Sequence, residues 1–127
     1  MAEFTGIVVS GFGEGSKFLS MPSYEVKFQL LLGFKPFPGT LNLKADAGEL
    51  QVALSGMNAL RIEPFEENGR KYGGISVYPA RIEGTKAFLV VPDINRHSQQ
   101  IAEFIAEENL RDKLSLKIGR ASCRERV

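Results

Sequence analysis

The chain has 127 residues, of which 43% are hydrophobic and 24% are charged, and its 16 Lys and Arg against 15 Asp and Glu give a net charge of +1. This composition is typical of one globular domain, and the near-zero charge argues against nucleic acid or an anionic membrane as a partner. One Cys and one His exclude an internal disulfide and make a closed structural zinc site implausible.

The N-terminus carries no targeting signal that the sequence makes evident. Met1–Phe4 lacks the charged-then-apolar layout of a signal peptide, and no apolar run in the chain approaches the ~20 residues of a membrane span. We therefore expect a cytoplasmic protein, and we expect it to be a monomer without a nucleic-acid or membrane partner.

The first strand is expected at residues 4–10, where apolar and β-branched residues dominate. Glycines at alternate positions follow it, at Gly11, Gly13 and Gly15. Alternate glycines let successive backbone N–H groups converge on an anion, although this spacing is neither a dinucleotide fingerprint nor a Walker A loop. It also fits a flexible hairpin turn that leads into a second strand at residues 17–19.

A helix is expected next. Pro22 can open it, because the N–H that proline lacks has no partner at that position, and Gly33 can end it in the left-handed conformation. Apolar residues recur on one face of this helix, at Tyr24, Phe28, Leu31 and Leu32.

A stiff loop then leads into a strand. Pro36 and Pro38 fix the backbone and Gly39 frees it, so the chain bends sharply before Thr40. In a strand that begins there, Thr40 and Asn42 lie on one face. Their hydroxyl and amide oxygens are hard ligands that suit Mg²⁺ shared with substrate phosphates. The alternative is a plain loop that enters an edge strand.

The middle of the chain has the pattern of short strands and one helix. Asp46 and Glu49 have the spacing of a capping box, so a helix is expected from about Ala47 to Leu54. Turn residues at Asn68-Gly69 and at Glu83-Gly84-Thr85 separate the extended segments. These segments cover residues 58–63, 72–82 and 86–91.

The end of the chain offers two candidate charged groups. Ser98 can cap a short helix with Ile101, Phe104 and Ile105 facing inward. Glu103 is then either a solvated carboxylate or a functional acid. Arg111 is either a surface residue or a group that pairs with phosphates or a base edge.

Residues 118–127 differ from everything before them. They are basic and aperiodic, and they resemble translated sequencing-adapter DNA. We therefore expect a domain at residues 1–117 followed by a non-native tail, with little native packing from about Gly119 onward. A natural basic tail is the alternative.

Several motifs together resemble one family. The stretch Leu32-Gly33-Phe34-x-Pro36-Phe37-Pro38-Gly39-Thr40-Leu41-Asn42 is similar to the signature of the archaeal type of CTP-dependent riboflavin kinase. The glycine loop of that family is matched by Gly11–Gly15. Its middle is matched by Arg70–Gly74 and Tyr78-Pro79, and its late strand by Leu89–Pro92. The similarity runs in order from about Gly6 to about Leu116.

The resemblance implies a fold that the element count also favours. About six short strands with hairpin spacing and three short helices argue for a compact β-barrel rather than a parallel sheet. The family implies a mainly β, six-stranded cradle-loop barrel with about three short helices. Family members usually have a further strand after Lys117, and its loss would leave a partly unpaired seam.

The resemblance also implies an activity, the transfer of the γ-phosphoryl of CTP to riboflavin with Mg²⁺, giving FMN and CDP. It places Mg²⁺ on Thr40 and Asn42, and the flavin on Asn95 and Glu103, with Glu103 the best candidate to bind the acceptor or take its proton. It places the nucleotide on Gly11, Phe12, Gly13, Glu14, Gly15, Ser16, Glu108, Asn109, Leu110 and Arg111.

Two positions depart from the family pattern. Asn95 stands where the family usually has Thr, and Glu107 stands where it often has Pro. Two other functions compete with the kinase. One is a flavin- or nucleotide-binding barrel without catalysis. The other is a DNA-binding regulator, which would need a basic face that this sequence lacks.

Overall fold

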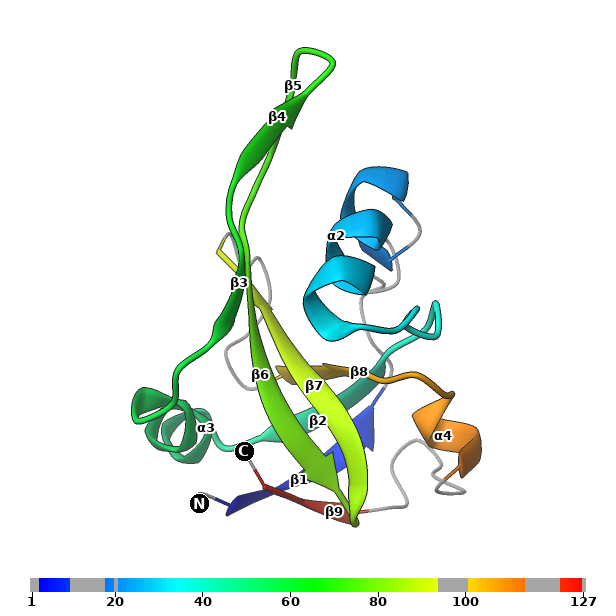
Figure 1. The fold of residues 1–127 in the computed structure, drawn as a ribbon. Helices are drawn as coiled ribbons and strands as arrows, with labels where there is room; N and C mark the ends of the chain where they lie inside the picture. The colour runs from blue at the N-terminus through cyan, green and yellow to red at the C-terminus, as the bar shows by residue number, and fades with distance from the viewer. Residues whose placement is uncertain (1–2, 10–17, 20, 94–100, 114–121, 127) are drawn as a thin grey trace.

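The computed structural model describes residues 3–9, 18–19, 21–93, 101–113 and 122–126 (Figure 1). No helix among these residues is long and apolar enough to span a membrane. The elements are β1 (Glu3–Val9), α2 (Pro22–Leu32), β2 (Leu41–Ala45), α3 (Ala47–Ser55), β3 (Leu60–Ile62), β4 (Phe65–Glu67), β5 (Arg70–Tyr72), β6 (Ile75–Ile82), β7 (Thr85–Pro92), β8 (Ile101–Ile105), α4 (Leu110–Lys113) and β9 (Ser122–Arg126).

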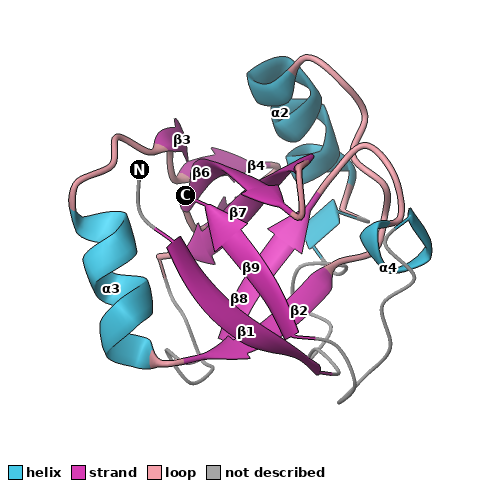
Figure 2. Ribbon diagram, turned by 90° about the horizontal axis from the view of Figure 1, so that it is seen from below, coloured by secondary structure: helices cyan, strands magenta, loops and turns pink. Residues whose placement is uncertain are grey.

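Six of these strands pair in a closed circuit (Figure 2). Antiparallel pairs run in the order β1–β2–β8–β7–β6, and β9 pairs with both β1 and β6. The beginning of β6 also pairs with β3. The expected mainly β fold with three short helices is therefore confirmed, and the pairing is that of a six-stranded barrel.

The strand β9 corrects one expectation. Residues from Gly119 onward were expected to contribute little packing, yet the backbone of Ser122–Arg126 pairs with Glu3–Ile7 on one side and with Arg81 and Ile82 on the other. Without it, β1 and the end of β6 would each present unpaired N–H and C=O groups. Ladder hydrogen bonds come from the backbone, so a segment without apolar alternation fills the position. The non-native origin of residues 118–127 stays a prediction.

Two further segments differ from expectation. Ile101–Ile105 is the strand β8 rather than part of a helix, because it fills the position between β2 and β7. Apolar residues lie on both of its faces, Ala102 and Phe104 on one and Ile101 and Ile105 on the other, and such a run has no period that tells strand from helix. Phe18 and Leu19 are helical rather than extended.

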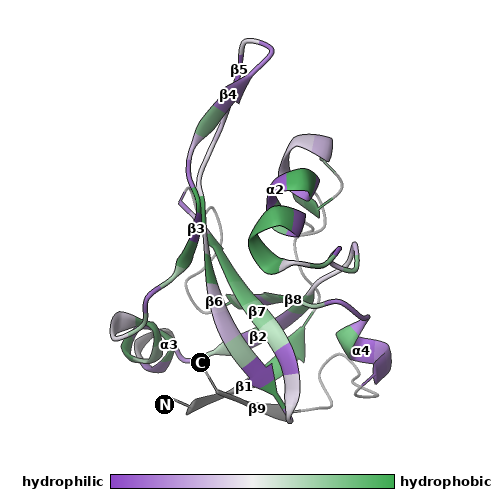
Figure 3. Ribbon diagram, viewed as in Figure 1, coloured by the Kyte–Doolittle hydropathy of each residue, from purple (hydrophilic) through white to green (hydrophobic). Residues whose placement is uncertain are grey.

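The core has two parts, on the inner and outer faces of the same strands. Alternate residues of β7 show the division, since Ala87 and Leu89 belong to the cluster inside the barrel. Phe88 and Val90 belong to the cluster that includes Tyr24 and Phe28 of α2. Figure 3 shows this apolar character along β7 and on α2. The strand β7 is therefore buried on both faces, as its continuous apolar run requires.

The turns and caps form as the sequence indicates. Asn68 and Gly69 both have positive φ, 53° and 76°, in the two-residue turn between β4 and β5. Gly33 ends α2 in the left-handed conformation, with φ of 82°. The side chain of Asp46 accepts a hydrogen bond of 2.9 Å from the backbone N–H of Glu49, so the predicted N-cap of α3 is confirmed.

One backbone contact positions the loop between α2 and β2. The N–H of Phe37 donates to the carbonyl of Ala106 at 2.8 Å. Ala106 directly follows β8, and α4 begins four residues later. The loop is therefore held beside the end of β8 and the start of α4, where the candidate site lies.

Candidate functional site

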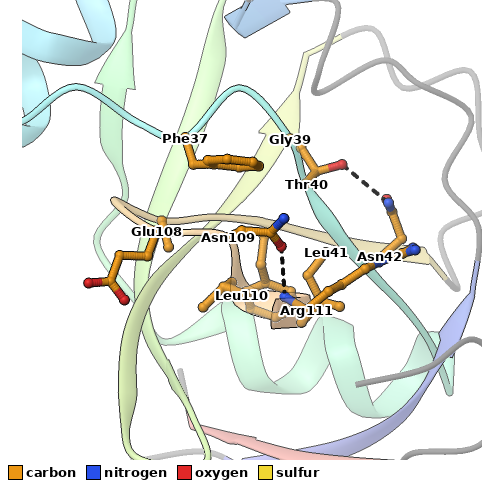
Figure 4. A pocket seen from close by; sticks show the side chains of 11 residues that line it. Phe37, Gly39, Thr40, Leu41, Asn42, Glu108, Asn109, Leu110 and Arg111 are labelled. Carbon is orange, nitrogen blue, oxygen red and sulfur yellow. Dashed lines mark hydrogen bonds between the residues drawn. The ribbon is translucent and has the colours of Figure 1, made fainter. Parts of the chain in front are cut away.

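A pocket of about 260 Å³ opens where the loop before β2, the end of β8 and the start of α4 meet (Figure 4). It brings together residues about 70 positions apart, because β2 and β8 are adjacent in the sheet. The residues that line it are Phe37, Gly39, Thr40, Leu41, Asn42, Phe104, Ala106, Glu108, Asn109, Leu110 and Arg111.

Thr40 and Asn42 lie side by side in this pocket, as period-two alternation predicts. The Asn42 Nδ2 donates to Thr40 Oγ1 at 3.2 Å (Figure 4). Asn42 is only 3% exposed, and its Oδ1 is buried without a hydrogen-bond partner. A buried acceptor without a partner costs free energy, and a ligand that bound Oδ1 after the amide had turned toward Thr40 would remove that cost.

These two side chains fit a magnesium ion. Both carry neutral oxygen atoms, which Mg²⁺ accepts together with water and substrate phosphates. Two neighbouring ligands of an octahedral Mg²⁺ at about 2.1 Å lie roughly 3 Å apart. The 3.2 Å between Asn42 Nδ2 and Thr40 Oγ1 is close to that value, and half a turn of the Asn42 amide exchanges Nδ2 for Oδ1.

The described residues hold no group of three or more His, Cys, Asp or Glu side chains placed to bind a metal. A metal held by Thr40 and Asn42 would need further ligands, which water and phosphate can supply. This is the usual arrangement for Mg²⁺ in phosphoryl transfer.

The start of α4 forms the opposite wall. Asn109 Oδ1 accepts from the backbone N–H of Arg111 at 3.1 Å and of Asp112 at 3.3 Å, so it caps this short helix. The cap occupies the Asn109 oxygen and leaves its amide N–H groups as donors. Leu110 is 4% exposed and joins the core inside the barrel.

Arg111 reaches across to the first strand. Its Nη2 donates to the carbonyl of Val9 at 3.0 Å, across 102 positions of sequence, and its Nε is buried without a hydrogen-bond partner. Glu108 is exposed and pairs with Lys113 at 3.1 Å. Asn109 and Arg111 of this wall therefore line the pocket, and Glu108 is an exposed acid beside them.

Glu103 lies near the pocket but not in its lining. It is opposite Asn42 in the β2–β8 register and opposite Val90 in the β7–β8 register. Directly paired residues have their side chains on the same face of a sheet, so Glu103 shares the face of Asn42. Its side chain is half-buried on a strand rather than solvated on a helix.

Some expected site residues lie outside the described residues, namely Gly11–Ser16 and Asn95. Val9 is the last described residue before the first of these segments, and Asp93 is the last before the second. The structure thus brings together Thr40, Asn42 and the 108–111 segment, with Glu103 beside them.

Five lining residues were not expected as site residues from the sequence: Phe37, Gly39, Leu41, Phe104 and Ala106. Phe104 and Ala106 were hidden by the helix expected over their segment. Phe37 had a visible signal, since it is an aromatic residue between two prolines directly before Gly39 and Thr40.

Comparison with known proteins assigns the family. Residues 8–121 match the family model CTP-dep_RFKase, described as "Domain of unknown function DUF120". The chain belongs to the CTP-dependent riboflavin kinase domain family. The match includes every residue that lines the pocket and stops before β9.

Archaeal relatives named riboflavin kinase show the same similarity. The chain is 41% identical to the protein of Methanosarcina mazei over 119 residues, 92% of this chain and 53% of that protein. It is 43% identical to the protein of Thermococcus kodakarensis over 115 residues, with coverage of 90% and 54%. It is 41% identical to the protein of Ignicoccus hospitalis over 116 residues, which are 90% of this chain and 65% of that protein. The chain thus spans about half to two thirds of the length of these relatives.

Proposed function

We propose that this protein is a CTP-dependent riboflavin kinase, which transfers the γ-phosphoryl group of CTP to the 5′-hydroxyl of riboflavin and gives FMN and CDP. The observation that carries the proposal is one pocket that combines Thr40 and Asn42 with the 108–111 segment. The family assignment and the names of the archaeal relatives support the choice of substrates.

Thr40 and Asn42 would hold Mg²⁺ through Oγ1 and Oδ1. Bound there, Mg²⁺ would supply positive charge against the negative charge that develops on the phosphates during transfer. The protein's own contribution is rigid placement of the two oxygens. Pro36 is buried, the Phe37 N–H is bonded to Ala106, and Asn42 lies within the paired strand β2.

The start of α4 would bind the nucleotide. Asn109 offers its amide N–H groups and Arg111 offers its buried Nε–H, and both are donors that can meet ribose, phosphate or base oxygens. Gly11–Ser16 would add backbone N–H groups to the phosphates. The Arg111–Val9 bond ties this wall to the strand that precedes Gly11–Ser16 in the chain.

In the transfer step, the 5′-oxygen of riboflavin attacks the γ-phosphorus and the bond from that phosphorus to the β–γ bridging oxygen breaks, so that CDP leaves with the electron pair. The hydroxyl proton must move to a base. Glu103 would accept it or bind the flavin, because it lies on the same face as Asn42. Asn95 would give a second flavin contact.

Incubation of the protein with riboflavin, Mg²⁺ and either CTP or ATP tests the proposal, with FMN measured by chromatography. We expect FMN with CTP and much less with ATP. Equal formation of FMN with both would overturn the nucleotide preference. Binding of riboflavin and CDP without any FMN would instead identify a binding module of the same fold.

A further inference from the structure

The ring of Phe37 is held at the pocket by an unusually stiff piece of chain. Pro36 and Pro38 fix the backbone on both sides, and the Phe37 N–H donates to the Ala106 carbonyl at 2.8 Å. The ring also lies close to the backbone of Gly39, since a Cβ built there would be 2.9 Å from Phe37 Cε1. Any larger residue at position 39 would push the ring.

Phe37 is not a core residue. Neither hydrophobic cluster of the described residues includes it, and its side chain stays half-exposed while lining the pocket. Phe34, three residues earlier, contrasts with it. Phe34 packs against the core beneath α2, with its ring centroid 5.8 Å from that of Phe88. Packing therefore explains Phe34 but not Phe37.

The ring lies across the pocket from a polar wall. Figure 4 shows the Phe37 ring edge-on above Asn109 and Leu110, with Arg111 beyond them, so one face of the ring is turned toward the pocket. A flat apolar face on one side and N–H donors on the other are what a nucleobase needs, because its faces stack and its edge carries acceptors.

We propose that Phe37 is the stacking surface for the base of the nucleotide, and that Gly39 has no side chain so that the ring can take this position. This inference rests on the proposed function, because it assigns one part of the substrate to one residue of the same pocket. It makes Phe37 a binding residue that acts on the base and not on the phosphates.

The base suits this position better than the flavin does. The pocket has a volume of about 260 Å³, which is enough to hold a pyrimidine base. Glu103, the candidate for flavin binding, does not line the pocket, whereas Arg111 does. The flavin ring system is therefore expected outside this pocket.

Calorimetry with two magnesium-bound ligands tests the assignment: CDP, which carries the base, and tripolyphosphate, which does not. The proteins compared are wild type, Phe37→Leu, Phe37→Tyr and the matched control Phe34→Leu. We expect Phe37→Leu to weaken CDP binding about tenfold or more, because a stacking face is lost. Phe37→Tyr, which keeps the ring, should bind CDP nearly as wild type does.

Tripolyphosphate should bind all four proteins equally. Phe34→Leu should lower the melting temperature but leave CDP affinity unchanged. If Phe37→Leu does not fold, Gly39→Ala moves the same ring and is expected to weaken CDP but not tripolyphosphate.

Unchanged CDP affinity in folded Phe37→Leu would overturn the proposal, as would equal weakening of both ligands, which would mean that the ring only shapes the pocket. Riboflavin binding is measured in the same way. If Phe37→Leu weakened riboflavin binding more than CDP binding, the proposal would also be overturned. If wild type binds CDP, and if this binding depends on Phe37, but no FMN forms from riboflavin and CTP, the kinase assignment alone would be overturned.

Discussion

Gly74 occupies a position where a side chain has no room. A Cβ there would lie 2.6 Å from Asp93 Oδ2, 2.8 Å from Arg61 Nη2 and 2.9 Å from Pro64 Cδ. Its neighbour Gly73 is exposed, and a Cβ there would meet nothing within 4 Å. The two adjacent glycines therefore serve different ends, and only Gly74 is required by packing.

We expect Gly74→Ala to lower the free energy of unfolding by about 1–3 kcal/mol, because the ion pair or the strand must shift to admit the methyl group. Gly73→Ala is the matched control and should change it by less than about 1 kcal/mol. Urea unfolding of both variants measures the difference. Equal effects of the two substitutions would show that the close contact at Gly74 is relieved without cost.

Single residues were predictable from the sequence where the reason is local. Thr40 and Asn42 share a face because alternate residues of a strand do. Asp46 caps its helix because its side chain accepts a hydrogen bond from the backbone N–H of Glu49, only three residues further along the chain. The bond from Arg111 to Val9 was not predictable, because it spans 102 positions and depends on the closure of the sheet.

At the scale of elements, an ion pair joins β3 to the residue after β7. Arg61 donates to both carboxylate oxygens of Asp93, at 2.7 and 3.0 Å, and to Ser76 Oγ at 2.9 Å. The Asp93 N–H also donates to the Gly74 carbonyl at 3.0 Å. These bonds hold the end of β7 against the start of β6.

The hydrogen bonds from Arg61 lower the pKa of Asp93 below its ordinary value of 3.8. A carboxylate whose pKa is lower in the folded state adds stability above its unfolded pKa, and that stability is lost as the pH falls through the folded pKa. We expect wild type to be more stable than Asp93→Asn at pH 7, and the difference to shrink below about pH 4. Urea unfolding from pH 7 to pH 3 measures it. A difference that stays constant down to pH 3 would contradict the role of the charge.

Strands were harder to predict than turns. The Asn68-Gly69 turn needs positive φ, and its two residues tolerate it. The strand β8 has no comparable signal, since Ala102 and Phe104 face the barrel interior while Ile105 packs in the outer cluster. A segment buried on both faces shows no alternation, so only its place between β2 and β7 decides its structure.

At the scale of the whole molecule, β9 closes the barrel. It pairs with β1 along Glu3–Ile7 and with the end of β6, and no other described strand joins these two. The sequence of residues 118–127 gave no indication of this, because ladder bonding needs only an extended backbone and two open edges. Closure is a property of the assembled sheet.

We expect deletion of residues 122–127 to lower the melting temperature by several degrees, because two sheet edges lose their hydrogen-bond partners. Replacement of Arg124 by Thr, which keeps the strand, is the control and should have a small effect. An unchanged melting temperature after the deletion would mean that β9 adds nothing to the stability of the barrel.

The measurement that most directly tests the proposed site is FMN formation from riboflavin and CTP as a function of Mg²⁺ concentration, for wild type, Thr40→Val and Asn42→Leu. Thr40→Val keeps the shape and the strand preference but removes the hydroxyl. We expect the turnover of Thr40→Val to fall roughly a hundredfold or more, which corresponds to ~3 kcal/mol of transition-state stabilisation, and Asn42→Leu to show the same pattern. The free energy of unfolding of Thr40→Val should change by less than about 1 kcal/mol. Added Mg²⁺ should recover part of the activity of both variants. Curves that coincide with wild type for both would contradict the account and leave this stretch as scaffold.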